Sequence, residues 1–144
     1  MSTALIQMGC AVGFEVWATT RNDEGAAIAE HLGANRIFRH GDQLPRRTDA
    51  VVTTPGPRPW ADSLRAVKRG VVVVINGVTT GHAAETDLLR IFVEQVDIHG
   101  TIMGTLEEMK AMAGRNTNWM AAPARRSCRK RSLSAAMSLS VSAK

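Results

Sequence analysis

The chain has 144 residues, of which 44% are hydrophobic and 22% are charged, so it can form one domain with a core but not a typical two-domain enzyme. No apolar run approaches the ~20 residues of a membrane helix, and the N-terminus has no secretory pattern, so we expect a cytoplasmic protein without a membrane partner. Cys10 and Cys128 have no Cys-x-x-Cys spacing, and four scattered His do not complete a zinc site, so we expect no bound metal.

The net charge of +5 is carried by the end of the chain. Residues 1–113 hold 11 Lys and Arg against 13 Asp and Glu, whereas residues 114–144 hold 7 Lys and Arg and no acid. Amphipathic periodicity also stops there, which predicts a folded domain over residues 1–113 and a disordered basic Ser/Ala/Arg-rich tail over 114–144. Translation in a shifted reading frame would give such an abrupt change.

Helices and strands alternate in the first part of the chain, with short loops between them. In chain order we expect helix 2–12, strand 14–19, helix 23–32, strand 36–38, strand 49–53, helix 59–68, strand 71–76, helix 86–94, strand 96–102 and helix 105–112. Five consecutive β-branched residues at 71–75 indicate a strand covered on both faces, as in parallel sheets. The order predicts an α/β domain with a doubly wound parallel sheet.

Small residues follow three of the expected strands, at residues 19–21, 53–56 and 77–81. The carboxyl ends of parallel strands meet at one edge of the sheet, where backbone and small side chains let a ligand approach. This pattern predicts a nucleotide cleft at that edge.

Five stretches then resemble the cofactor-binding half of the medium-chain dehydrogenase/reductase family, in the branch of zinc-binding alcohol dehydrogenases and quinone oxidoreductases. They are residues 14–21, 31–35, 51–56, 68–81 and 98–105. The resemblance covers about residues 2–113 and implies a Rossmann-type fold. It also implies NADPH-dependent reduction of a small-molecule carbonyl, enone or quinone.

The resemblance places the end of the second family strand, here Thr19, Thr20 and Arg21, against the adenosine ribose. An acid at this point would favour NAD, whereas an Arg accommodates the 2′-phosphate of NADP. This chain has Arg21 and no acid at the tip, so we expect NADP (NADPH) as the cofactor. The alternative is that Arg21 is a solvated residue that opens a helix.

The resemblance implies further cofactor contacts in three segments. They are Thr53, Thr54 and Gly56 beneath the ribose, Gly77 and Val78 beside the nicotinamide, and Thr101 and Met103 closing the nicotinamide pocket. An ordinary strand-end turn would also explain Gly77, and core packing would explain Met103. No catalytic residue is assigned, since His31, His40, His82 and His99 match no family catalytic position and have the setting of surface residues.

The chain also departs from the family. The first strand, the Gly-rich loop after it and the catalytic domain have no counterpart, so we expect a truncated, inactive cofactor-binding fragment. Family strand order is 3-2-1-4-5-6, so loss of strand 1 would leave a central gap of about 10 Å unless the two halves closed on each other. We therefore expect a marginally stable or aggregation-prone monomer.

Several other functions stay open. They are an NADP-binding module with a separate catalytic half, another Rossmann-type enzyme such as a methyltransferase, and a basic-tailed binder of nucleic acid or anionic surfaces. We do not expect nucleic acid as a partner, because no aromatic residue follows Trp119 to stack on bases. A homo-oligomer is left open.

Overall fold

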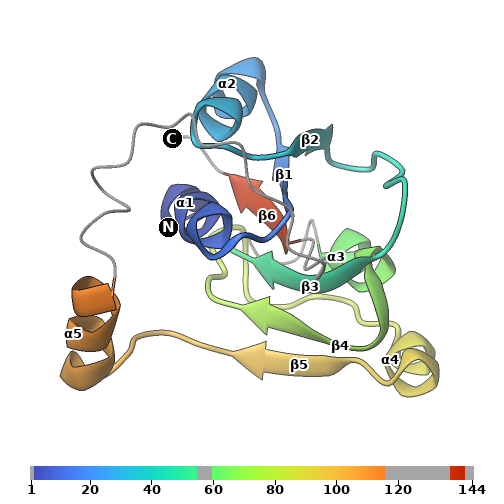
Figure 1. Cartoon of the computed structure of the whole chain (residues 1–144). Coiled ribbons are helices and arrows are strands. Elements are labelled where there is room, and N and C mark those ends of the chain that lie inside the picture. Colours follow the sequence, from blue (N-terminus) through green and yellow to red (C-terminus); the bar gives the residue numbers. More distant parts are fainter. Residues whose placement is uncertain (1, 55–59, 116–136, 142–144) are drawn as a thin grey trace.

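Six parallel strands form one sheet in the order β2-β1-β6-β3-β4-β5, with helices on both faces (Figure 1). The structure is a computed structural model that describes residues 2–54, 60–115 and 137–141. The strands are β1 Val16–Thr20, β2 Arg36–Arg39, β3 Thr48–Thr53, β4 Val67–Ile75, β5 Asp97–Gly100 and β6 Met137–Val141. The helices are α1 Ser2–Val12, α2 Asp23–His31, α3 Trp60–Ala66, α4 Leu88–Glu94 and α5 Leu106–Arg115. The predicted α/β Rossmann-type class is confirmed.

Two hydrophobic cores lie on opposite faces of the sheet, because successive residues of a strand point to opposite sides. Val52 of β3 faces the core beneath α1 and α2, whereas Val51 faces the core beneath α3 and α4. The buried residues of the first core are Ile6, Val16, Ala18, Ala29 and Val52. Those of the second are Val51, Trp60, Leu64, Ala66, Val67, Val73 and Val96. The doubly wound arrangement therefore follows from the apolar strands in the middle of the chain.

Local capping residues set several helix ends where the sequence predicts them. The Asn22 side chain accepts a hydrogen bond from the Gly25 amide at 3.0 Å and begins α2. Gly33, with φ of +98°, follows that helix in the left-handed conformation. Thr105 and Glu108 form the predicted capping box of α5, with reciprocal hydrogen bonds of 3.2 and 2.7 Å. This prediction is confirmed.

The centre of the sheet differs from the expectation. The strand β6 lies between β1 and β3 and is parallel to both, so it fills the position that strand 1 occupies in the family order. There is no gap between the two halves. Met137–Val141 thus belong to the sheet and α5 continues to Arg115, whereas the rest of the expected tail lies outside the described residues.

The fourth strand also begins earlier than its sequence predicts. We expected a helix to residue 68 and a strand from 71, but α3 ends at Ala66 and β4 starts at Val67. Gly70 adopts φ of +70°, and the pairing of β3 with β4 shifts register at this point. Glycine adopts the left-handed conformation without steric penalty, so β4 continues through an irregularity that would end the strand if another residue type stood there.

Candidate functional site

The loops after β3 and β4 meet at the carboxyl edge of the sheet, as the strand-end pattern predicts. The Asn76 amide donates to the Thr53 carbonyl at 3.1 Å. The Ser2 hydroxyl, at the start of α1, lies 3.3 Å from the Thr54 hydroxyl. Three segments that are far apart in the sequence are therefore joined at one edge.

Gly77 packs directly on the backbone of the neighbouring loop. A Cβ atom at this position would lie 2.6 Å from the Thr54 carbonyl oxygen, closer than real Cβ contacts. Its φ is not left-handed, so glycine is required here by the close approach of two backbones and not by an ordinary turn. Val78 follows Gly77 and is 52% exposed at the carboxyl edge of the sheet.

Thr53 carries a buried hydroxyl for which the described residues provide no hydrogen-bond partner. The residue is 2% exposed, and its Oγ1 is buried. Thr53 and Val78 both line a cavity of about 210 Å³ beneath the Gly77 loop. A buried hydroxyl without a partner costs about 1–3 kcal/mol, so Thr53 contributes an unsatisfied polar group beside this cavity.

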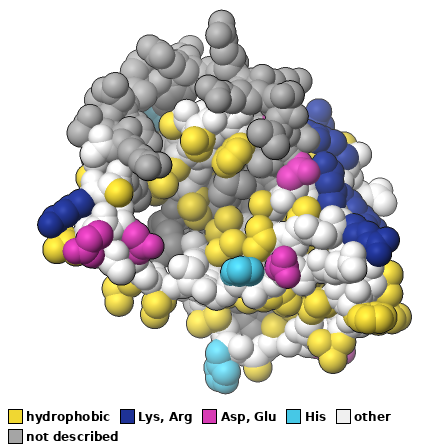
Figure 2. All heavy atoms as spheres, turned by 60° about the horizontal axis from the view of Figure 1, so that its bottom comes forward, with side chains coloured by type: hydrophobic (Ala, Val, Ile, Leu, Met, Phe, Trp, Pro, Cys, Tyr) yellow, Lys and Arg dark blue, Asp and Glu magenta, His cyan; other side chains and the backbone are white. Residues whose placement is uncertain are grey.

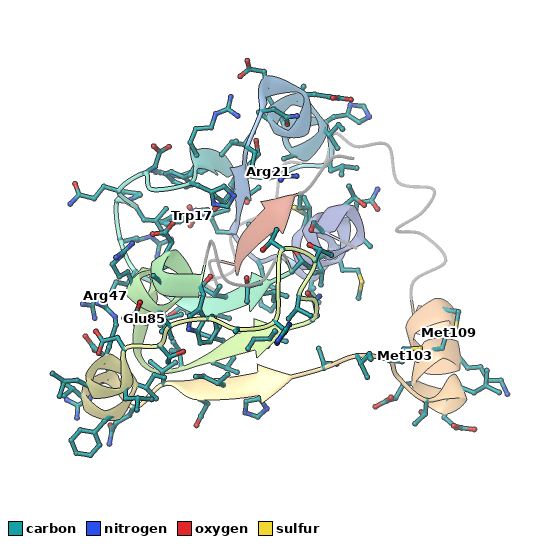
Figure 3. The ribbon with its side chains drawn as sticks, turned by 180° about the vertical axis from the view of Figure 1, so that it is seen from behind. Trp17, Arg21, Arg47, Glu85, Met103 and Met109 are labelled. Atoms are coloured by element: carbon teal, nitrogen blue, oxygen red, sulfur yellow. The ribbon has the colours of Figure 1, made fainter. Side chains whose placement is uncertain are left out.

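At the end of β1, the three residues expected to meet the ribose have different environments. Thr19 is half-buried and lines a larger cavity. Thr20 is fully buried and donates its hydroxyl to the Asn22 carbonyl at 2.7 Å, so it holds the turn before α2. Arg21 is exposed beyond the end of β1 and lies beside the tip of β6 (Figure 3).

A second arginine lies at the same edge and was missed by the sequence reasoning. Arg39 ends β2 and pairs in register with Thr20. Its guanidinium donates to the Thr20 hydroxyl at 3.3 Å and forms an ion pair with Asp23. The expected strand ended at residue 38, and only the finished sheet shows that β2 is the neighbour of β1 and that Arg39 is in register with Thr20.

The remaining predicted site residues are not all brought together. The Thr101 amide donates to the Ile75 carbonyl at 2.9 Å, which places Thr101 beside the start of the Gly77 loop. Met103 lies farther out on the segment between β5 and α5 and is 85% exposed (Figure 3). The alternative interpretation of Met103 as a core residue is therefore wrong. Gly56 lies outside the described residues.

A larger cavity of about 470 Å³ lies between α3 and the loop after β2. Arg46 and Arg47 line it, and both form ion pairs, with Glu15 and Glu94 respectively. Arg46 also stacks 5.2 Å from the ring centroid of Trp17, which is 1% exposed. These arginines cover and support the sheet.

The ion pair of Arg47 with Glu94 should make stability depend on pH. The hydrogen bond from Arg47, 2.7 Å long, lowers the pKa of Glu94 below its ordinary value of 4.5. The contribution of this ion pair to the free energy of unfolding is fully present above the ordinary pKa of the carboxyl group. It is lost as the pH falls through the lowered pKa that Glu94 has in the folded protein. We expect Glu94→Gln to lower the melting temperature slightly at pH 7, with the difference from wild type disappearing at acidic pH.

Melting curves of wild type, Glu94→Gln, Arg47→Ala and the double variant at pH 7 and at pH about 3 check this expectation. At neutral pH, the melting temperature of the double variant should fall by no more than that of either single variant. Equal differences at the two pH values would contradict the assignment.

No three His, Cys, Asp or Glu side chains in the described part of the chain form a group that could hold a metal ion. No helix in that part is long and apolar enough to cross a membrane.

Comparison with known proteins connects this edge to a family. A family profile described as "Zinc-binding dehydrogenase" matches residues 1–117. No curated protein sequence gives a significant match.

Among solved structures, a cobalt- and zinc-bound thermostable alcohol dehydrogenase from Pyrobaculum aerophilum is similar, with a TM-score of 0.66 and 25% identity over 76% of this chain. A mycobacterial protein complexed with NADPH has a TM-score of 0.69 and 17% identity over 85%. A Bacillus subtilis protein with NAD bound has a TM-score of 0.66 and 20% identity over 84%. The matches cover 35%, 43% and 39% of those chains, so this chain spans less than half of their length.

Proposed function

Because the chain belongs to the zinc-binding dehydrogenase family, we propose that its carboxyl edge binds a nicotinamide dinucleotide and prefers NADPH to NADH. The observation that carries this proposal is the packing of Gly77 on Thr54 beside the buried Thr53 hydroxyl. Gly77 lets the two loops pack together, and the cavity beside them, lined by Thr53 and Val78, supports binding of part of a ligand at this edge.

The preference for NADPH rests on charge at the end of β1. Arg21 is exposed there, Arg39 lies on the neighbouring strand, and Thr19 and Thr20 provide no carboxylate. Guanidinium groups bind phosphate oxygens bidentately, and a 2′-phosphate adds about two negative charges that a ribose hydroxyl lacks. Arg21 is the residue we expect to discriminate, because it directly follows β1 at the point where the family resemblance places the adenosine ribose.

The reaction that we propose for this protein is reduction of a small carbonyl, enone or quinone. NADPH supplies the hydride when bound, and the residues of this chain orient the cofactor. In this role Thr54 and Gly77 hold the two loops together, and Val78 limits the space above the small cavity. The described residues do not fit a zinc site, so we derive no step through a metal.

A second candidate function is a cofactor-binding module that works with a separate catalytic half. Because the chain spans 35–43% of the three solved relatives named above, it can supply a cofactor site while another polypeptide supplies the substrate pocket. In that case the purified chain binds NADPH without reducing a carbonyl substrate, and addition of the catalytic half restores turnover.

Titration with NADPH and NADH tests the proposed preference. We expect Arg21→Ala to weaken NADPH binding by roughly 10- to 100-fold, since a hydrogen bond to a charged group contributes about 1.5–3 kcal/mol. NADH binding should change little, because NADH has no 2′-phosphate. Isothermal titration calorimetry on the same preparations gives both affinities.

The matched control is Arg69→Ala. Arg69 is also exposed, and its Nε donates to the Gln95 side chain at 3.3 Å, away from the ends of β1 and β2. This variant should bind both cofactors as wild type does. Equal weakening of NADPH and NADH by Arg21→Ala, or no weakening of either, would refute the assignment.

A further inference from the structure

The loop between β4 and α4, residues 76–87, borders the small cavity at the carboxyl edge of the sheet. Residues 78–85 of this loop are all exposed, so the loop has no buried core of its own. A segment with so few buried contacts takes its position from the points at which it is attached to the rest of the protein. The described contacts provide one such point near each end of the loop. The loop residues that line the cavity are Val78, Gly81, His82, Ala84 and Thr86.

The first attachment is the packing of Gly77 on the Thr54 carbonyl oxygen, which holds the start of the loop against the end of β3. A tight turn follows, because the Gly81 amide donates to the Val78 carbonyl at 3.1 Å and Gly81 has φ of +129°. This turn defines the local shape of residues 78–81. It does not define the direction of the rest of the loop, which depends on the second attachment.

The second attachment comes from Trp60, the first residue of α3. Trp60 is buried and belongs to the second hydrophobic core, so the surrounding side chains fix the position of its ring. The indole Nε1 donates to the Thr86 hydroxyl at 2.9 Å, and this hydroxyl lies 3.3 Å from the Ala84 carbonyl, to which it donates. The apolar ring is thus anchored in the core, while its polar N–H is connected through one hydroxyl to the backbone of the loop.

The helix that follows the loop is held only lightly by the hydrophobic core. No residue of α4 is buried, and its exposed hydrophobic side chains form the yellow patch at the lower right of Figure 2. Ile91 packs against the second core, and the Arg90 Nε donates to the Leu64 carbonyl at 2.9 Å. These contacts hold α4 on α3, whereas the hydrogen bond from Trp60 to Thr86 acts on the loop itself.

We propose that Trp60 is a positioning residue for the cofactor, which acts through Thr86 to hold the loop and its Val78 at the carboxyl edge. This inference rests on the proposed function, because it concerns how that same edge receives the dinucleotide. With the loop attached at Gly77 and at Thr86, Val78 keeps its place beside the cavity at Thr53 before a ligand binds. A site that is already ordered loses less conformational entropy on binding, so breaking the second attachment weakens affinity.

The position of the loop in the sheet predicts which cofactors are affected. The order β1-β6-β3-β4 places Arg21, which follows β1, on the other side of β3 from the loop after β4. Trp60 and Thr86 therefore act on groups that NADPH and NADH share, whereas Arg21 acts on the 2′-phosphate. Loss of the indole hydrogen bond should lower both affinities by the same factor and leave the preference for NADPH unchanged.

Calorimetric titration of the full chain with NADPH and with NADH tests this role. Trp60→Phe keeps an aromatic ring in the core and removes the N–H, and we expect it to weaken both cofactors by roughly 3- to 10-fold, the range of one neutral hydrogen bond. Thr86→Val should have the same effect, whereas Thr86→Ser keeps the hydroxyl and should bind as wild type does. The double variant Trp60→Phe/Thr86→Val should bind no more weakly than the weaker single variant, because both changes remove the same bond.

The fluorescence of bound NADPH separates positioning from lost stability. Lower stability reduces the fraction of folded chain but does not change the emission of NADPH bound to folded chain. A loosened loop should shift that emission toward the emission of free NADPH, in Trp60→Phe and in Thr86→Val alike. Thr86 is only half-buried, so its valine variant tests the role even where the Trp60 variant does not fold.

Trp17→Phe is the matched control, because Trp17 is also buried and its Nε1 donates to the Glu15 carboxylate at 2.9 Å, on β1 and away from the loop. This variant should bind both cofactors as wild type does, with unchanged emission. Wild-type affinities in both Trp60→Phe and Thr86→Val would overturn the positioning role and leave the proposed function intact. Weakening of NADPH alone would also overturn it, whereas a wild-type chain that binds neither cofactor would refute the proposed function itself.

Discussion

Gly77→Ala is expected to weaken NADPH binding by at least ~10-fold and to lower the free energy of unfolding by about 1–3 kcal/mol. The added Cβ would lie 2.6 Å from the Thr54 carbonyl oxygen, which is backbone and cannot rotate away. The two loops must therefore separate, and their separation displaces Val78 and opens the cavity at Thr53. Urea unfolding gives the change in stability, and calorimetric titration gives the change in affinity.

The control for this prediction is Gly114→Ala. Gly114 lies in α5, where a Cβ would have no atom within 4 Å, and alanine has the higher helix propensity. This variant should bind cofactor as wild type does and be at least as stable. If Gly77→Ala binds NADPH normally, the packing of Gly77 on Thr54 does not shape the cofactor site.

Features with a local cause could be predicted from the sequence. The amino end of α2 is set by Asn22, whose side chain accepts a hydrogen bond from the first turn. Its carboxyl end is followed by Gly33, which adopts the left-handed conformation common at that position. The Thr105–Glu108 capping box needs only four residues. The start of β4 was misplaced because Gly70, which usually interrupts a strand, is accommodated by a register shift against β3.

For the site, the strand ends at Thr54 and Gly77 could be predicted because any parallel sheet brings such ends together. The contact of Arg39 with Thr20 depends on which strands are neighbours and on their register, and no local pattern specifies either. The exposure of Met103 depends on what packs against the segment between β5 and α5, so an apolar residue type alone could not reveal it.

The strand β6 could not be predicted because its signal is weak and its partners are distant. Apolar residues alternate with serine along Met137–Val141, but only over five residues in a stretch rich in Ser, Ala and Arg. Its register places Leu139 between Ala18 of β1 and Val52 of β3, more than 80 residues earlier in the chain. Only the finished sheet provides the position that this segment occupies.

The largest effect on stability is therefore expected from changes in β6. Truncation after residue 136 should abolish the cooperative urea transition, because it separates β2-β1 from β3-β4-β5 and exposes two strand edges in the middle of the sheet. Leu139→Pro should act in the same direction and cost about 3 kcal/mol or more, since proline lacks the N–H that a central strand requires. That is a large part of a typical stability of about 5–15 kcal/mol.

Leu139→Val serves as the control, because valine keeps the backbone donor and favours strands, so its transition should remain cooperative. Far-UV circular dichroism and binding of a hydrophobic dye, recorded along the urea series, report loss of the sheet and exposure of its cores. If the truncated chain unfolds at the same urea concentration as wild type, then β6 does not hold the two halves together. The edges of β1 and β3 would then have to pair with each other or with another chain, and the arrangement of Thr20, Thr53 and Gly77 along one edge of the sheet would need a different explanation.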